Sequence, residues 1–349
     1  MHLFHVSFFH VSGLSKWLTP LVNILALGLV LSSSVFAASS VQGKTLKSVR
    51  DRGYLICGVG TNDIGFATQD KQGLWVGFDV DFCRAIASAV LKNDQAIKFI
   101  PLDSQNRFRA LQQEKIDVLI RTTTWTLSRD TNMALDFAGV TLFDEQGVLV
   151  HNHITADSLV NMDGLSICAN IGTTSLDNLE ALIASKELNI NVLKLATQEG
   201  RWRAFFNREC DAITADRSDL FAKLSTLSNA SKKYRVLNDY IAKEPLGPVV
   251  RDDDRQWFDI VKWVIYAVIL AEEKNINSSD LANKLKQFDA PESSNLGLNP
   301  KWPSYVVQSV GNYGQIYDRN LGVDSSIRIP RGINRLWTEG GVLYAMPFK

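Results

Sequence analysis

The sequence is poor in histidine and has no excess of either charge. Only five of its 349 residues are His, and three of these lie within the first ten positions. Lys and Arg together number 37, as do Asp and Glu, so the formal net charge is zero. General nucleic-acid binders normally carry a basic excess or a basic stripe, which this composition lacks. We therefore expect no nucleic-acid partner.

Sequence motifs typical of catalysis and of metal binding are also missing. The chain has no Gly-x-Ser-x-Gly, no phosphate-binding loop, no His-Glu-x-x-His and no Cys-x-x-Cys. The two remaining His, His151 and His153, lie on a polar connector, so a Ser or Cys nucleophile has almost no base to draw on. We expect no metal site, no cofactor and no enzymatic activity, although carboxylate chemistry stays open because Asp and Glu are plentiful.

The N-terminal segment has the pattern of a secretory signal peptide. Lys16 precedes an apolar run over 17–35, and small residues end the segment around Ala37. We expect residues 1–37 to be removed after export. The alternative is a membrane anchor that is retained.

Four cysteines remain after that segment: Cys57, Cys83, Cys168 and Cys210. Export to an oxidising compartment favours disulfides. Four cysteines allow three pairings, and sequence order favours Cys57–Cys83 and Cys168–Cys210. Each bridge would then lie inside one domain and leave the domains free to move.

Strands and helices alternate in two passes of similar outline, which indicates an α/β fold. The first pass has strands at 54–60, 96–101 and 117–120 and helices at 82–91 and 107–114, after a helix at 45–52. The second has strands at 166–169, 191–196 and 211–214 and helices at 176–185 and 200–207. Turn residues at 70–73 predict a hairpin.

The two passes predict two lobes, each a central sheet flanked by helices, joined by a hinge of two strands. Crossings are expected near 147–152 and 244–250, where β-rich runs meet Gly or Pro. Helices at 256–271 and 279–287 return to the first lobe. The first lobe is therefore predicted to be discontinuous (38–148 plus 248–349, with a C-terminal extension) and the second to span 149–247.

The segment 121–129 follows a predicted strand, and ligands of α/β sheets bind at the carboxyl ends of strands. Arg129 has the fork geometry for a carboxylate, and Thr122 and Thr124 supply hydroxyls. The alternative is a solvated Arg at a helix start beside Asp130.

Two further segments complete a candidate site. Gly172, Thr173 and Thr174 lie between a strand and a helix, where unpaired N–H groups favour an anion, although ordinary helix caps look the same. Asp216 follows a strand and can pair with an ammonium group, or with Arg217, or cap the next helix. An Arg for a carboxylate and an Asp for an ammonium are what a buried free amino acid requires.

The segment Gly77-Phe78-Asp79-Val80-Asp81-Phe82-Cys83-Arg84-Ala85-Ile86-Ala87 resembles the signature of the family 3 bacterial extracellular solute-binding proteins, which serve amino-acid ABC transporters. The stretches TTWTLSRDT, KEPLGP and VGNYGQIYDRNLG resemble the general L-amino-acid-binding branch of that family. The similarity covers essentially the whole chain after residue 37.

The resemblance implies a two-lobed periplasmic binding protein that closes on a free L-amino acid and docks, as a monomer, on a membrane permease. Arg129 would hold the α-carboxylate with help from Thr124 and the turn at 172–174. Thr122 and Asp216 would take the α-ammonium group.

The aromatic lining departs from the family pattern, in which many relatives cover the ligand with a ring from the first loop. Here that stretch is 62–66, and Phe66 corresponds to a later, core-facing aromatic. Trp125 either covers the ligand from the other side or belongs to the core. A periplasmic dehydratase of the cyclohexadienyl or arogenate type and a sensor input module remain as alternatives.

Overall fold

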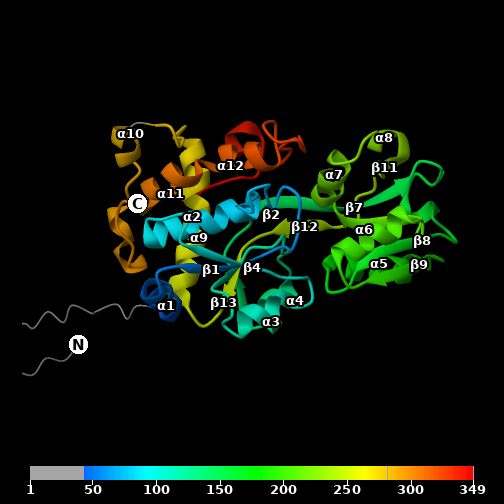
Figure 1. Cartoon of the computed structure of the whole chain (residues 1–349), viewed down its shortest axis with the longest axis horizontal. Coiled ribbons are helices and arrows are strands. Elements are labelled where there is room, and N and C mark those ends of the chain that lie inside the picture. The colour runs from blue at the N-terminus through cyan, green and yellow to red at the C-terminus, as the bar shows by residue number, and fades with distance from the viewer. Residues whose placement is uncertain (1–42, 281, 349) are drawn as a thin grey trace, which may run out of the picture. The chain divides into compact units, whose positions relative to one another are not determined.

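The structure is a computed structural model that describes residues 43–280 and 282–348, and it contains two β-sheets with helices on their faces (Figure 1). The strand order is β4–β1–β5–β13–β6 in the first sheet and β11–β7–β10–β8–β9 in the second, with β12 paired to β7. Strands β4 and β5 run parallel to β1, and β9 and β10 run parallel to β8. We call each sheet with its helices the first and the second lobe. The predicted α/β class is confirmed.

The strands of the first sheet are β1 (Leu55–Val59), β4 (Ile97–Pro101), β5 (Val118–Leu119), β6 (Leu135–Phe137) and β13 (Val249–Arg251). Those of the second are β7 (Leu142–His151), β8 (Ser166–Asn170), β9 (Asn191–Leu195), β10 (Ala212–Asp216), β11 (Tyr234–Val236) and β12 (Lys243–Leu246). The α-helices up to the second crossing are α1 (Lys44–Arg52), α2 (Phe78–Leu91), α3 (Arg107–Gln112), α4 (Leu127–Asn132), α5 (Thr174–Lys186), α6 (Gln198–Phe206), α7 (Arg217–Ser225) and α8 (Ala230–Lys233). Those after it are α9 (Arg255–Glu273), α10 (Ala282–Lys286), α11 (Trp302–Val310) and α12 (Tyr313–Asn320), and three 3₁₀ turns lie at Leu159–Asn161, Pro291–Leu296 and Trp337–Glu339.

The helix predicted at 82–91 begins four residues earlier, at Phe78. Gly77 precedes it with φ +138°, and a Cβ there would lie 2.1 Å from the carbonyl oxygen of Phe66. Only glycine fits this close approach, so the chain turns directly from the hairpin into α2. The hairpin itself, β2 (Thr68–Gln69) and β3 (Trp75–Val76), surrounds the turn predicted at 70–73.

Both passes use an Asp before their third strand in the same way. The Asp117 carboxylate accepts the N–H of Ile56 at 2.7 Å, and the Asp211 carboxylate accepts the N–H of Ser166 at 2.8 Å. Each Asp thus ties the start of its own strand to that of the neighbouring parallel strand. The two passes therefore share this contact as well as their order of strands and helices.

The first crossing lies earlier than predicted. Strand β12 pairs with residues 142–145 of β7, and from Gln146 onward β7 pairs with β10. The segment predicted to cross, 147–152, is therefore largely inside the second sheet, because its apolar residues at 148–150 are fully buried there. The lobe boundaries at 148/149 and 247/248 stay predictions, and the predicted signal peptide at 1–37 lies outside the described residues.

Hydrophobic clusters cover both faces of each sheet. The largest joins β1 to α2, α9, α11 and α12, which lie side by side in Figure 1. Trp257, Trp302, Tyr313 and Tyr317 are its largest buried side chains. The C-terminal extension therefore completes the core of the first lobe, and its helices α11 and α12 were not predicted.

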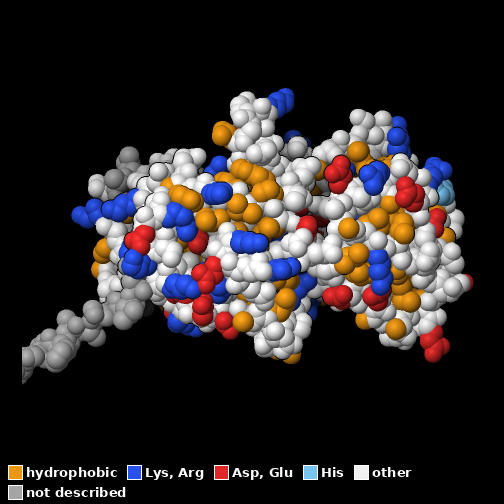
Figure 2. All heavy atoms as spheres, turned by 60° about the horizontal axis from the view of Figure 1, so that its bottom comes forward, with side chains coloured by type: hydrophobic (Ala, Val, Ile, Leu, Met, Phe, Trp, Pro, Cys, Tyr) orange, Lys and Arg blue, Asp and Glu red, His pale blue; other side chains and the backbone are white. Residues whose placement is uncertain are grey.

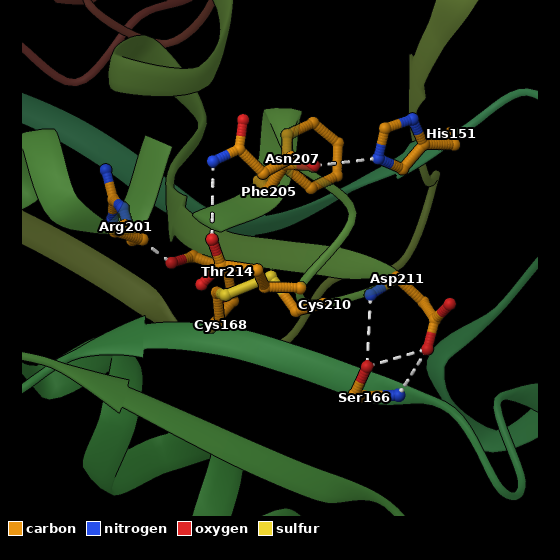
Figure 3. Close-up of a disulfide and its surroundings, with 10 residues drawn as sticks. His151, Ser166, Cys168, Arg201, Phe205, Asn207, Cys210, Asp211 and Thr214 are labelled. Atoms are coloured by element: carbon orange, nitrogen blue, oxygen red, sulfur yellow. Dashed lines mark hydrogen bonds between the residues drawn. A yellow bond between two sulfur atoms is a disulfide. The ribbon is translucent and has the colours of Figure 1, made fainter. Parts of the chain in front are cut away.

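The cysteines pair in the way that sequence order favours. Cys57 of β1 bonds to Cys83 of α2, and Cys168 of β8 bonds to Cys210 just before β10. Figure 3 shows the second bridge between the Ser166–Asp211 hydrogen bonds and the contact of Arg201 with Thr214. Each bridge joins elements of one lobe.

Acidic and basic side chains are interspersed over the face shown in Figure 2, in line with the balanced composition. Within the described part of the chain, no helix has both the length and the apolar character that crossing a bilayer requires.

Candidate ligand-binding site

A polar pocket lies where loops of both lobes meet, and the two lobes belong to one compact unit. About 600 Å³ of space free of protein atoms lies among its lining residues, and part of this space is open to solvent. The first lobe contributes Asp63, Ile64, Phe66, Ser104, Arg107, Arg121, Thr122 and Thr124. The second contributes Asn170, Thr173, Thr174, Ser175, Gln198, Arg201, Ala215, Asp216, Ser218 and Asp219. Charged and hydroxyl groups dominate this lining, which suits a polar, charged ligand.

The carboxyl ends of parallel strands place most of these groups. Arg121 and Thr122 follow β5, Asn170 ends β8, and Asp216 ends β10. Thr122 has φ +37°, an unfavourable conformation for a β-branched residue. Asp79 of α2 holds it there by accepting the Thr122 N–H at 2.9 Å. Asp79 belongs to the segment 77–87, so this segment fixes the backbone of a pocket residue without lining the pocket itself.

The Asp216 carboxylate neither caps the following helix nor pairs with Arg217, the two alternatives that the sequence left open. It makes no helix-cap hydrogen bond, and Arg217 instead approaches Glu145 (3.8 Å) and donates to the carbonyl of Leu237 (3.1 Å). Burial raises the pKa of Asp216 well above its usual range, and the nearby carboxylates of Glu244 and Asp144 raise it further. A ligand cation at this point would relieve both effects.

Arg129 is buried rather than solvated, with 8% of its surface exposed. Its Nη1 donates to the carbonyl oxygen of Thr124 at 2.9 Å, and its guanidinium lies 5.3 Å from the ring centroid of Phe108. Burial lowers its pKa, while the carboxylates of Glu244, Asp177 and Asp216 act in the opposite direction. Arg129 therefore lies directly behind Thr124 and is not itself part of the pocket lining.

Glu244 of β12 links the two lobes and was not predicted as a site residue. Its Oε2 accepts from the hydroxyls of Thr124 and Thr174, which lie 3.1 Å apart, and Asn178 donates to its Oε1 at 3.4 Å. Burial raises the pKa of Glu244. When Glu244 is ionised and both hydroxyls donate to it, the two Thr oxygens offer lone pairs to a ligand, which suits an ammonium group more than a carboxylate.

The remaining predicted residues divide between the pocket and its surroundings. Thr173 and Phe66 line the pocket, and the Thr173 hydroxyl also caps α5 by accepting the N–H of Leu176 at 3.2 Å. Gly172 (φ +76°) lies outside the lining, and its carbonyl accepts from Arg107 at 3.2 Å. Trp125 also lies outside and stacks on the ring of Phe137, with 38% of its surface exposed.

Sequence reasoning missed five charged residues of the lining: Asp63, Arg107, Arg121, Arg201 and Asp219. Arg107 and Arg201 are on short helices after strands, where an Arg usually reaches solvent, yet they are only 2% and 4% exposed. Arg201 forms an ion pair with Asp219, which also accepts from Gln198 at 2.7 Å. A sequence signal was available only for Asp63, because it stands in the segment 62–66 that departs from the aromatic pattern expected from the resemblance.

The fold and this pocket define a class: two α/β lobes, joined by paired strands, that surround a small polar ligand. Residues 55–281 match the sequence model of the bacterial extracellular solute-binding proteins, family 3, and the chain belongs to that family. It is 40% identical over 324 residues to the general L-amino acid-binding periplasmic protein AapJ of Rhizobium johnstonii, covering 89% of this chain and 95% of that protein.

Two further relatives extend the comparison. The glutamate/glutamine/aspartate/asparagine-binding protein BztA of Rhodobacter capsulatus is 37% identical, over 90% of this chain and 96% of that protein. A solved periplasmic binding protein of an ABC transporter from Brucella ovis, with glutathione bound, is 38% identical with a TM-score of 0.82, over 87% of this chain and 99% of that one.

Proposed function

We propose that this protein is the periplasmic substrate-binding component of an ABC transporter for polar and general L-amino acids. It captures the free amino acid by closure of the two lobes and delivers it to a membrane permease. The observation that carries the proposal is the Asp216 carboxylate, free of its local partners, in a pocket that has the buried Arg129 directly behind its wall.

A zwitterionic ligand explains why the site has both a carboxylate, from Asp216, and guanidinium groups. An amino acid loses its hydration when it is enclosed, so each of its poles needs an opposite charge or several hydrogen bonds. Asp216 and the lone pairs of the Thr hydroxyls suit the ammonium group. The guanidinium groups of Arg107 and Arg121 in the lining, with Arg129 behind Thr124, suit the carboxylate. Each charge-assisted hydrogen bond contributes roughly 1.5–3 kcal/mol, so a few of them reach the ~8 kcal/mol of micromolar binding.

The relatives support the ligand class. AapJ is named for general L-amino acids and BztA for acidic amino acids and their amides, and the Brucella ovis protein holds a tripeptide with a free amino-acid head. By the same reasoning we assign residues 1–37 to a cleaved signal peptide and the mature chain to the periplasm. We further propose that it acts as a monomer and catalyses no reaction.

Calorimetry on ligand-stripped protein tests the assignment. Each of the twenty amino acids is titrated into wild type, Arg129→Ala, Asp216→Asn and the control Arg109→Ala, whose side chain is exposed on α3. We expect micromolar binding by wild type and a loss of at least ~100-fold for both site variants, because a buried pole without its partner costs about 3 kcal/mol or more. The control should bind as wild type does.

Two results would contradict the proposal. Equal affinity of Arg129→Ala and wild type would show that the carboxylate is held elsewhere. Turnover of arogenate or prephenate by the same preparation would show a dehydratase instead of a transport protein.

A further inference from the structure

The pocket contains buried polar atoms that no described residue satisfies. Both carboxylate oxygens of Asp63, the Nε of Arg107 and the Nε of Arg201 are shielded from solvent and have no hydrogen-bond partner among the described residues. Buried polar groups are nearly always hydrogen-bonded, and leaving one without a partner costs roughly 1–3 kcal/mol. Their concentration in the pocket indicates that a ligand completes them.

Asp63 and Arg201 belong to opposite lobes. Asp63 is 5% exposed in the loop after β1, and Arg201 is 4% exposed on α6. Arg201 is held by its ion pair with Asp219 and by donation to the carbonyl of Thr214 at 3.2 Å, so its Nε has a fixed direction. The described residues form no ion pair with Asp63. Burial raises the pKa of Asp63, and the charges of Arg121 and Arg201 lower it.

Under the proposed function, Asp216 takes the ammonium group of the amino acid. Arg107, whose guanidinium lies near the Phe108 ring as that of Arg129 does, takes the carboxylate. Asp63 and Arg201 are then left for the ligand side chain, and together they offer one unsatisfied acceptor group and one unsatisfied donor. An apolar side chain satisfies neither, a carboxylate satisfies Arg201 but is repelled by Asp63, and an ammonium group does the reverse. An amide satisfies both, because its C=O accepts and its N–H donates.

We infer that Asp63 and Arg201 form a side-chain subsite that selects ligands with a side-chain amide, with Asp63 accepting the amide N–H and Arg201 donating to the amide C=O. The amide can come from glutamine or from the side-chain-linked peptide bond of a γ-glutamyl peptide. Because the two residues belong to different lobes, a ligand of this kind also draws the lobes together. The inference rests on the proposed function and names its preferred substrates.

The test compares ligands that share the amino-acid head and differ in the side chain. Glutamine, glutamate, alanine and glutathione are titrated calorimetrically into ligand-stripped protein at pH 8, which favours the ionised form of Asp63. The variants are Asp63→Asn and Arg201→Ala, with Asp163→Asn and Arg203→Ala as controls, since both control side chains are exposed and Arg203 shares α6 with Arg201. Thermal melting verifies that each variant is folded.

Wild type should bind glutamine at least about tenfold more tightly than glutamate, and one charge-assisted hydrogen bond is enough for that ratio. Asp63→Asn should reverse or abolish this preference, Arg201→Ala should weaken glutamine about tenfold or more, and alanine should change less than about twofold in both. If the affinity for glutathione changes in the variants as the affinity for glutamine does, γ-glutamyl peptides belong to the ligand class. If glutathione does not bind, the class is restricted to amino acids with a side-chain amide.

The inference is overturned if wild type binds amino acids without preferring glutamine to glutamate. It is also overturned if Asp63→Asn leaves the ratio of the two affinities unchanged or weakens alanine equally. Absence of binding for every amino acid, by contrast, would refute the proposed function itself.

Discussion

The burial of Asp79 predicts how the free energy of unfolding depends on pH. Its carboxylate is 4% exposed, lies in the first turn of α2 and accepts the N–H of Thr122 at 2.9 Å. Burial raises its pKa from 3.8 to about 7, and this exceeds the opposing effects of the Thr122 hydrogen bond and of the Arg121 charge. The substitution Asp79→Asn removes the charge and keeps an oxygen that can accept the same hydrogen bond.

The sign and size follow from proton linkage. Between pH 4 and 7 the folded protein keeps a proton on Asp79 that the unfolded chain releases, so the free energy of unfolding falls as the pH rises through this window. The rise of the Asp79 pKa from 3.8 to about 7 corresponds to ~4 kcal/mol. Asp79→Asn should therefore be more stable than wild type at pH 8 by up to about 4 kcal/mol and close to wild type at pH 4.

Urea unfolding of ligand-free protein at several pH values between 4 and 8 measures this difference. Other buried carboxyls, such as Asp144 with its pKa raised to about 6, also tilt the wild-type curve, so only the difference between the two proteins counts. Asp163→Asn, with its exposed side chain, is the control and should parallel wild type. A difference between Asp79→Asn and wild type that is the same at pH 4 and pH 8 would show that Asp79 ionises as an ordinary carboxyl.

Two further perturbations probe the scaffold. Replacing Cys168 and Cys210 together by Ser opens a loop of 42 residues and should lower the free energy of unfolding by about 4 kcal/mol, and an unchanged urea midpoint would contradict this. Asn334→Ala removes a side chain that donates to the Phe143 carbonyl at 2.9 Å and accepts the Phe143 N–H at 2.8 Å, so stability should fall by roughly 1–3 kcal/mol. Asn334→Asp places a buried carboxylate against the Phe143 carbonyl oxygen and should be at least as destabilising as Asn334→Ala at neutral pH in the same assay.

Much of the fold could be predicted from the sequence, because local patterns encode it. The strand–helix alternation is confirmed with end shifts of a few residues, and the predicted helix at 256–271 is α9. The N-terminal turn of α2 was missed because its start depends on a tertiary contact between Gly77 and Phe66, which periodicity does not report. The tail helices α11 and α12 were missed because each is short and because Pro303, Gly311 and Gly314, which lie in or between them, usually interrupt helices.

The pocket was predictable only in part. Thr122, Thr124 and Asp216 were named because they follow strands, and strand ends are visible in the sequence. Asp63 and Arg201 were missed because their significance lies in burial without a partner, which depends on what the other lobe places nearby. Glu244 was missed for a related reason, since a crossing strand gives no sign that its acid meets hydroxyls from both lobes.

The side chain of Asn334 has a consequence for how the molecule can bend. It forms hydrogen bonds with the backbone N–H and C=O of Phe143 on one side of β7. On the other side of β7, Pro245 of β12 lies opposite Phe143. Flexing at Phe143 would break bonds on both sides at once. We therefore expect bending to concentrate at positions 144 and 145, which pair with β12 alone before β7 joins β10. By holding Phe143, the C-terminal extension would shorten the segment that can bend and so limit how far the lobes open.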